Sequence, residues 1–436
     1  MGRSTRIESY YAATAPATPE RAELRDSIDC DVCVIGGGIA GCSTALHLAE
    51  RGYSVALLEE HYVGWGASGR SGAQAIHGVA AGQSQLERLI GATAARTVWD
   101  VSIEGLTLMR ELIARYRIDC DWAPGHMLVA VKSPHLQELQ AELRQLRDTL
   151  GYPSVRYVPR DELCSILGTD RYRGALYDSN SGHLHPLNYT IGLAAAAERN
   201  GARIFEGTRA LGFKPSLGST SAVRIRTERG EVRARYLVLC GNVYLGDTAP
   251  QLGAKILPIG SHIIATAPLG ADRARSLIAN NAAICDMNRV LDYYRRSSDH
   301  RLLFGGRISH AGCDSSAAAE ATRQRATRQR MLRVFPQLTD AAIDYSWGGY
   351  IDLTLNRAPN FGRLAPNIYF LQGFSGHGIA LTGIAGKLVC EAIAGTAERF
   401  DVFARIPHRD VPGGTRVRRP LVALALAYYR LRDLLS

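Results

Sequence analysis

The stretch that most constrains this chain is DVCVIGGGIAGCSTALHLAERGYSVALLEE, residues 31–60. Its pattern predicts a strand, a glycine-rich turn, a helix and a second strand that ends on an acid. Gly36, Gly38 and Gly41 form a G-x-G-x-x-G motif directly after the first strand. In such a motif the first glycine makes the tight turn, the second lets the backbone approach a pyrophosphate, and the third lets the helix pack closely on the sheet. The helix N-terminus then faces the negative charge, so the stretch predicts a dinucleotide-binding fold.

The acid at the end of the second strand narrows the choice of dinucleotide. Glu59 lies 23 residues beyond Gly36 (59 − 36) and is followed by Glu60. A carboxylate at this place accepts hydrogen bonds from the adenosine ribose hydroxyls and would repel a 2′-phosphate. NADP is therefore disfavoured, which leaves FAD and NAD.

A second glycine pattern, GWGASG at residues 64–69, is expected to be a loop. It follows no free strand and leads into GRSGAQ rather than into an apolar helix. The chain is therefore predicted to hold one dinucleotide fold, whereas reductases that pass electrons from NAD(P)H to a flavin usually carry two. The substrate itself is then the expected reductant.

The composition describes an ordinary globular protein of 436 residues, with 46% apolar and 21% charged residues. The sequence has no run of about 18 uncharged apolar residues, so no membrane-spanning helix is predicted. The net charge of +10 is densest at 323–333 and 416–419, which we expect to be solvated helix faces rather than a nucleic-acid site. Of nine cysteines, Cys30 and Cys33 form a C-x-x-C pair, which we expect to be buried strand residues rather than a redox or zinc site. A reducing cytoplasm is the predicted location.

Four pieces of the chain resemble the glycine oxidase and D-amino-acid oxidase superfamily of FAD enzymes. They are GGGIAGCSTALHLAERG, GWGASGRSGAQ, YIDLTLNRAPNFGR and LQGFSGHGIALTGIAGKLVCEAI. Within that superfamily, SYYAAT, HIIATAPL, LDYYRRSSDHRLLFGGR and the C-terminal tail resemble the gamma-glutamylputrescine oxidases. The similarity runs from about residue 9 to the C-terminus and favours FAD over NAD.

The resemblance implies a set of cofactor-binding residues that is spread over the whole chain. The residues expected to hold FAD are Gly36, Gly38, Ile39, Ala40, Gly41, Glu59, Glu60, Gly66, Ala67, Ser68, Arg70, Ser71, Gly72, Ala73, Gln74, Ala210, Gly241, Gly373, Gly376, His377, Gly378 and Ile379. The family usually has asparagine and glycine where this chain has Ser71 and Ala73. Noncovalent FAD is expected, because the attaching cysteine of relatives falls near Gly348 or Gly349 and the attaching histidine near Ser71.

The resemblance also implies oxidation of an amine C–N bond by hydride transfer to flavin N5. The imine would hydrolyse to an aldehyde and ammonia, and oxygen or another acceptor would reoxidise the flavin, giving H2O2 with oxygen. The candidate catalytic residues are His262, Tyr293, Tyr350 and His377, with Tyr294 and His77 as further candidates for the site. No metal is expected.

The expected fold is α/β: a Rossmann-type FAD-binding domain built from discontinuous segments, with an inserted α+β substrate domain that carries a large mixed sheet. Helical patterns cover 84–117, 135–150, 187–200, 317–334 and 378–395, and strand-type sequence lies between them. The predicted division assigns 1–85, 186–250 and 341–436 to FAD binding, and 86–185 and 251–340 to the helical and substrate segments.

The substrate remains open between two classes. Relatives that oxidise sarcosine place a lysine for the substrate carboxylate where this chain has Ala380. Its absence favours a long primary amine of the gamma-glutamylputrescine kind. The alternative is an oxidase or dehydrogenase of a secondary amine or amino acid, such as sarcosine, proline, pipecolate or a D-amino acid.

A third class is a flavin-holding protein that modifies RNA or docks on a membrane, suggested only by the +10 charge. We expect no nucleic-acid partner. The amphipathic tail at 420–436 is expected to pack on the protein rather than on a membrane. The oligomeric state does not follow from the sequence.

Overall fold

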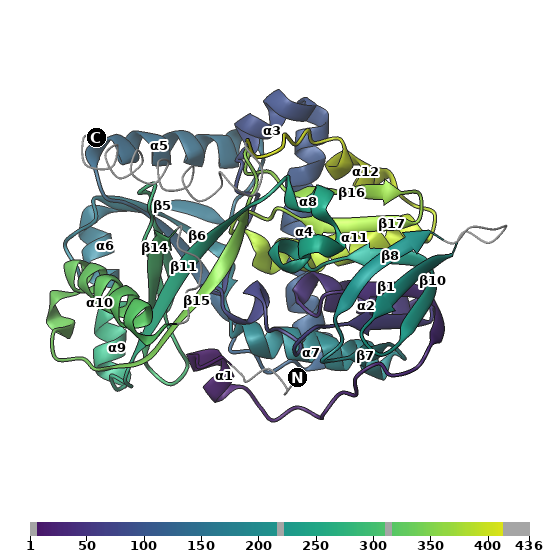
Figure 1. Cartoon of the computed structure of the whole chain (residues 1–436). Helices are drawn as coiled ribbons and strands as arrows, with labels where there is room; N and C mark the ends of the chain where they lie inside the picture. The colour runs from purple at the N-terminus through teal and green to yellow at the C-terminus, as the bar shows by residue number, and fades with distance from the viewer. Residues whose placement is uncertain (1–6, 216–221, 310–315, 413–436) are drawn as a thin grey trace.

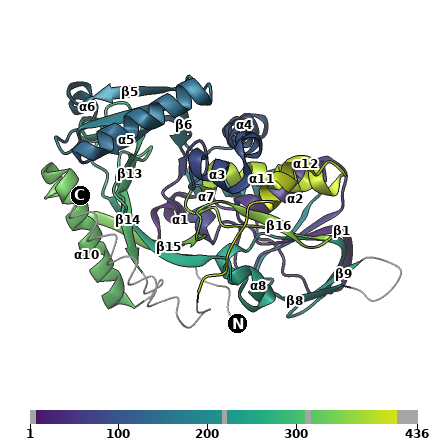
Figure 2. The same cartoon turned by 90° about the horizontal axis from the view of Figure 1, so that it is seen from above.

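Two sheets, each assembled from separated stretches of the chain, form the two halves of the molecule (Figure 1). The computed structural model describes residues 7–215, 222–309 and 316–412. Seen from above, one half carries the helices that surround the dinucleotide motif and the other carries a large sheet flanked by helices (Figure 2). The candidate site lies between these two sheets.

The first sheet has eight strands, and its central order is β16-β17-β10-β1-β2-β7. Strands β17, β10, β1, β2 and β7 run parallel, and β8 and β9 form a ribbon attached to β10. The strands are β1 (Ile28–Ile35), β2 (Val55–Leu58), β7 (Arg203–Phe205), β8 (Ala210–Pro215), β9 (Val223–Thr227), β10 (Glu231–Leu239), β16 (Asn360–Ala365) and β17 (Ile368–Gln372).

Apolar side chains on both faces of this sheet explain its parallel core. Val32 and Val34 of β1 belong to the cluster under the helices, whereas Cys33 and Ile35 belong to a second cluster on the other face. Such continuous apolar strands are typical of parallel sheets that are covered on both sides. The helices that pack on the first face are α2 (Ile39–Glu50), α7 (Pro186–Arg199) and α11 (Gly378–Ile393).

The second sheet has nine strands in the order β15-β11-β14-β13-β12-β4-β6-β3, with β5 paired to β6. Its pairs are antiparallel except for β4 with β12. The strands are β3 (Gln74–Ala75), β4 (Ala123–Ala130), β5 (Val155–Pro159), β6 (Gly174–His183), β11 (Leu257–Thr266), β12 (Ala283–Asp286), β13 (Tyr293–Arg296), β14 (Leu302–Ser309) and β15 (Ile343–Leu353).

The remaining helices pack around these two sheets. They are α1 (Tyr10–Thr14), α3 (Gln83–Ile90), α4 (Ala92–Tyr116), α5 (Ser133–Arg144), α6 (Arg160–Ile166), α8 (Pro250–Gly253), α9 (Ala271–Leu277), α10 (Ala317–Val334) and α12 (Glu398–Ala404). A π-helical turn η2 (Gln145–Thr149) follows α5, and short 3-10 turns are η1 (Ala67–Gly69), η3 (Asn242–Tyr244), η4 (Gly246–Thr248) and η5 (Pro336–Leu338).

The expected α/β class with a Rossmann-type half and a large mixed sheet is confirmed. The helical pattern at 84–117 is two helices, because Gly91 between them has a φ of 83° that the helix cannot continue through. Cys30 and Cys33 lie in β1 as free thiols; Cys33 is buried, as predicted, whereas Cys30 is half-buried. The basic segment 323–333 lies on α10.

The predicted domain boundaries remain a prediction, although the sheets bear on one of them. Strand β15 pairs along its length with β11, so residues 343–353 belong to the nine-stranded sheet rather than to the dinucleotide half. Helical and strand patterns do not reveal this, because strand sequence alone does not say which sheet a strand joins.

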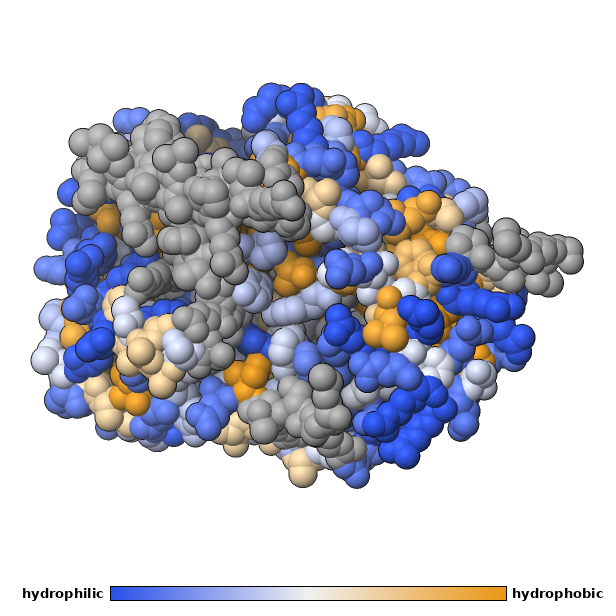
Figure 3. Space-filling model, viewed as in Figure 1, coloured by the Kyte–Doolittle hydropathy of each residue, from blue (hydrophilic) through white to orange (hydrophobic). Residues whose placement is uncertain are grey.

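Hydrophilic residues dominate the described part of the face seen in Figure 3, with hydrophobic residues in small groups between them. Among the described residues, no single helix is long and apolar enough to cross a membrane. Only α11 and α12 taken together have the required length and composition, and they are bent by 118°. The segment 416–419 and the tail 420–436 lie outside the described residues.

Candidate functional site

A cavity of about 630 Å³ opens between the two sheets. Its walls include the turns that follow β1, β2 and β10, which are neighbouring parallel strands of the first sheet, and residues of β11 and β15 from the second. The carboxyl ends of parallel strands are the usual place for ligands in such sheets. The volume lies in the range of small-molecule sites, about 300–1,000 Å³.

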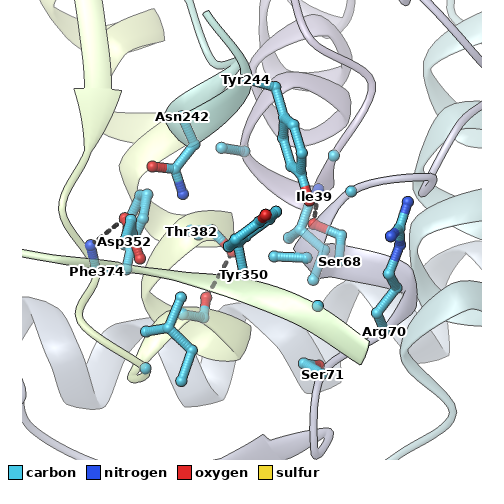
Figure 4. A pocket seen from close by; sticks show the side chains of 18 of the residues that line it. Ile39, Ser68, Arg70, Ser71, Asn242, Tyr244, Tyr350, Asp352, Phe374 and Thr382 are labelled. Carbon is cyan, nitrogen blue, oxygen red and sulfur yellow. Dashed lines mark hydrogen bonds between the residues drawn. The ribbon is translucent and has the colours of Figure 1, made fainter. Parts of the chain in front are cut away.

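The backbone of Cys240 and the side chain of Ser68 pack closely against the glycine turn after β1. A side chain on Gly36 or Gly38 would therefore have no space. Gly36 has a φ of +109°, and a Cβ on it would lie 2.8 Å from the Cys240 carbonyl. A Cβ on Gly38 would lie 2.9 Å from Ser68 Oγ. Ser68 Oγ accepts a hydrogen bond from Ile39 N at 3.0 Å, at the start of α2 (Figure 4). Gly38, Ile39 and Ala40 line the cavity, so the first turn of α2 presents its N-terminus to it.

Glu59 lies at the end of β2, where the sequence predicts a ribose-binding acid. Its carboxylate accepts hydrogen bonds from Gly37 N at 2.7 Å and His61 N at 2.9 Å. Burial raises the pKa of Glu59 to about 7, although these two hydrogen bonds act in the opposite direction. The side chain is fixed against the glycine turn and lines the cavity.

The loop after η1 supplies a cation whose hydrogen bonds are incomplete. Arg70 Nε donates to the Trp65 carbonyl at 2.6 Å, and its guanidinium lies 4.1 Å from the centre of the Trp65 ring. Its buried Nη2 has no hydrogen-bond partner among the described residues. The same holds for Oδ1 of Asn242, which lines the cavity beside Tyr244 (Figure 4). Unpaired buried polar atoms in a cavity indicate a polar ligand.

The far end of the cavity is formed by the turn that leads into α11. Phe374 N donates to Asp352 Oδ2 at 2.7 Å, so Asp352 holds this turn (Figure 4). Burial raises the pKa of Asp352 to about 6. Burial also lowers the pKa of His377, the residue before α11, to about 4, and the charges of His77 and Arg357 add to this effect. His377 is therefore neutral near pH 7.

Backbone strain concentrates at this cavity. Eight described residues other than glycine have a positive φ, and four of them line it: Ala73, Asn242, Arg357 and Ser375. This conformation is uncommon for alanine, and Ala73 has a φ of 63°. Strained residues gather at functional sites, so their clustering supports the assignment of this cavity.

Most of the predicted cofactor residues come together in this one place. Those that line the cavity are Gly36, Gly38, Ile39, Ala40, Glu59, Glu60, Gly66, Ala67, Ser68, Arg70, Ser71, Gly72, Ala73, Gln74, Ala210, Gly241, Gly376, His377, Gly378 and Ile379. Gly41 lies behind the turn, where a Cβ would be 1.8 Å from the Gly36 carbonyl oxygen. Gly373 shapes the other turn, with a φ of +76°.

Of the four predicted catalytic residues, Tyr293, Tyr350 and His377 line the cavity and His262 does not. In β11, Ser261 and Ile263 face the cavity, and side chains of a strand alternate between its faces. His262 therefore points to α10, where its ring contacts Thr327 Oγ1 at 2.9 Å and Glu320 Oε1 at 2.8 Å. This position does not support a catalytic role for His262, and we expect its side chain to fix α10 on the sheet instead.

The same alternation separates the two adjacent tyrosines of β13. Tyr293 lines the cavity and its hydroxyl lies 3.0 Å from Ser261 Oγ. Tyr294 faces the opposite way, where its ring stacks on Phe304 and its hydroxyl donates to Tyr172. Only Tyr293 is placed to contact a ligand.

Other predicted positions lie outside the main cavity. Ala380 is 3% exposed and does not line it; its carbonyl oxygen packs against Gly105 of α4. His77 lies in a neighbouring cavity.

Asp352, Asn242, Tyr244 and Thr382, which line the cavity, were missed by the sequence analysis. Asn242 and Tyr244 follow Gly241 directly and Asp352 lies within YIDLTLN, so proximity to the motifs was the available signal.

The comparisons with known proteins identify the family of this chain. Residues 31–392 match the DAO family, described as FAD dependent oxidoreductase. The chain belongs to this family. It is 42% identical over 429 residues to gamma-glutamylputrescine oxidoreductase of Escherichia coli (strain K12), covering 98% of each chain. It is 40% identical to a probable oxidoreductase OrdL of Haemophilus influenzae, covering 98% of this chain and 97% of that one.

Solved structures of the DAO fold superpose on this chain. Glycine oxidase from Bacillus cereus matches 88% of this chain and 99% of its own, with a TM-score of 0.71 and 20% identity. L-proline dehydrogenase from P. horikoshii matches 88% of this chain and 98% of its own, with a TM-score of 0.68. At this identity the likeness concerns the fold.

The residues of the main cavity fit FAD. Glycines leave room for a close approach at the start of α2, and Arg70 and Asn242 have polar atoms that lack partners among the described residues. A second helix N-terminus, that of α11, closes the opposite end. No group of three or more described His, Cys, Asp or Glu side chains is arranged to hold a metal ion.

Proposed function

We propose that this DAO family enzyme oxidises the primary amine of gamma-glutamylputrescine or a closely related long amine. The observation that carries the proposal is the 42% identity to gamma-glutamylputrescine oxidoreductase over 98% of both chains. The products would be an aldehyde and ammonia, with H2O2 when oxygen is the acceptor. We also propose that FAD is held noncovalently, that Gly36, Gly38 and Glu59 hold its adenosine end, and that the protein works in the cytoplasm.

FAD, when bound, supplies the hydride acceptor for the carbon beside the amine. The N-terminus of α11 would place its positive end where negative charge develops on the reduced cofactor. His377 would remain neutral near pH 7, so it adds no positive charge that repels the amine. Tyr293 and Tyr350 would form apolar walls that orient the substrate and exclude water.

A second candidate function is oxidation of a small amino acid, and one residue favours it. Arg357 lines the main cavity and acts on His377 electrostatically, so its guanidinium is placed to bind a substrate carboxylate, whereas Ala380 lies outside this cavity. Aerobic turnover of a panel separates the two functions: gamma-glutamylputrescine and putrescine against sarcosine, proline, pipecolate and D-alanine. Formation of H2O2 and ammonia with the first pair supports our proposal, and activity confined to the amino acids refutes it.

The attachment of the cofactor has a separate test. Acid precipitation should release all the yellow colour, since the described residues at the positions of attachment in relatives are Ser71 and Gly349. Flavin that stays with the precipitated protein would contradict noncovalent binding.

A further inference from the structure

A second cavity, of about 840 Å³, adjoins the first. It is lined by the loop at 77–82, by α3 and α4, and by α5 with its π-helical turn. His377 lines both cavities, so the two meet at the turn before α11. The second cavity therefore reaches the same end of the main cavity as the proposed reacting site.

The junction has a fixed histidine on its wall. His77 Nδ1 lies 2.9 Å from Asp178 Oδ2, and Asp178 also accepts hydrogen bonds from Tyr152 and Ser181. Burial alone would raise the pKa of Asp178, but the hydrogen bonds from His77 and Ser181 lower it overall. The carboxylate stays charged and holds the His77 ring in the wall of the second cavity, which His377 also lines.

Charges of both signs surround the second cavity. Glu142 and Glu138 lie one turn apart on α5, and Arg144 and Arg88 lie on α5 and α3. Glu142 is half-buried, and it forms no hydrogen bond or ion pair within the part of the chain that the structure describes. Burial raises the pKa of Glu142, and Glu138 adds to this while His77 opposes it. A half-buried carboxylate in this state gains from a cationic ligand.

Resting on the proposed function, we propose that this second cavity binds the remote, zwitterionic end of the substrate. Glu142, with Glu138, would bind the alpha-ammonium group, and Arg88 or Arg144 the alpha-carboxylate. The linear chain would then pass His77 and His377 and present its terminal amine in the main cavity.

The chemistry of the two ends supports this arrangement. The terminal amine must be neutral to react, whereas the remote ammonium and carboxylate keep their charges at neutral pH. A charge taken from water without a partner is costly, so an enzyme for such a substrate needs opposite charges away from the flavin. The second cavity offers both signs, joined to the main cavity at a single turn.

The test separates binding of the remote end from catalysis. Gamma-glutamylbutylamide carries the zwitterionic end but lacks the terminal amine that the proposed reaction oxidises, and N-butylacetamide lacks both the zwitterionic end and the terminal amine. By titration calorimetry, the FAD-loaded wild type should bind gamma-glutamylbutylamide about tenfold or more tightly than N-butylacetamide. This difference is the gain in affinity expected from hydrogen bonds to charged groups. Glu142→Gln should weaken binding of gamma-glutamylbutylamide about tenfold.

Glu87→Gln is the matched control, because Glu87 lies on α3 outside the cavity lining and is bonded by Gln83. It should bind as the wild type does, and an unchanged flavin spectrum shows that each variant is folded. The inference is overturned if the wild type binds gamma-glutamylbutylamide and N-butylacetamide equally well. It is also overturned if Glu142→Gln binds gamma-glutamylbutylamide as tightly as the wild type does. Failure of gamma-glutamylputrescine to reduce the flavin would instead refute the proposed function.

Discussion

At the scale of single residues, space and charge act together in the main cavity. Gly38 lies so close to Ser68 that even a Cβ would be 2.9 Å from its Oγ. Ser68 in turn accepts from Ile39, so the approach to α2 depends on both residues. At the other end of the cavity, the carboxylate of Asp352 is buried away from water and accepts a hydrogen bond from the backbone N–H of Phe374.

Gly38→Val should abolish most of the FAD retained by the purified protein. The branched side chain would displace Ser68 and occupy the space where a pyrophosphate approaches the helix. We expect affinity for FAD to fall by about tenfold or more, roughly 1.4 kcal/mol. The ratio of flavin to protein absorbance measures this. Gly212→Val on β8, where a Cβ would meet nothing within 4 Å, should keep its flavin.

Asp352→Asn should stabilise the FAD-free protein in a pH-dependent manner. The folded pKa of about 6 lies above the ordinary 3.8, so the folded state keeps a proton that the unfolded chain releases as pH rises from about 4 to 6. The wild type therefore loses stability across this range, by about 3 kcal/mol at most, and the loss stays constant above it. Asparagine does not titrate, and its carbonyl can still accept from Phe374.

Denaturant unfolding at pH 4 and pH 7.5 checks this sign. The stability gained by Asp352→Asn should be larger at pH 7.5. The exposed control Asp272→Asn should show no such trend. A gain that is equal at both pH values would show that Asp352 is not protonated preferentially in the folded state.

At the scale of elements, alternation along β11 and β13 decides which side chains reach the cavity. Ser261 and Tyr293 meet on the cavity face, and their neighbours His262 and Tyr294 are enclosed on the other face. One face of the nine-stranded sheet therefore serves the ligand and the other supports α10.

His262→Leu should lower stability and leave the chemistry intact. The substitution removes contacts to Thr327 and Glu320 on α10, which we expect to cost about 2 kcal/mol. The rate of flavin reduction by a good amine substrate should stay within about twofold of the wild type, a change below about 0.5 kcal/mol. Tyr293→Phe is the cavity-facing comparison. A large fall in the reduction rate of His262→Leu at unchanged stability would restore a catalytic role.

The motifs predicted the dinucleotide half well because each signal was local. Gly36, Gly38 and Glu59 are fixed by a turn and two adjacent strands, so their sequence spacing carries the geometry. The second cavity could not be predicted, because α3, α5 and the loop at His77 are joined only by tertiary packing. The position of His262 could not be predicted for the same reason, because the sequence indicates a strand but not which face of that strand lines the cavity.

At the scale of the whole molecule, two sheets built from interleaved segments enclose the main cavity, and a second cavity lined mainly by helices meets it at His377. The first sheet supplies the cofactor end through the turns after β1, β2 and β10. The second sheet and α11 supply the walls, and α3 and α5 extend the space past His377. Such an elongated site suits a long amine with its charges far from the reacting carbon.

Anaerobic stopped-flow reduction of the bound flavin tests the central claim most directly, because it observes the chemical step without the electron acceptor. Purified FAD-loaded protein is mixed with gamma-glutamylputrescine, or with sarcosine or D-alanine at the same concentration. We predict that gamma-glutamylputrescine bleaches the flavin much faster than either amino acid, and that air restores the colour. Faster bleaching by sarcosine or D-alanine would contradict the account and identify an amino-acid oxidase with another carboxylate-binding cation.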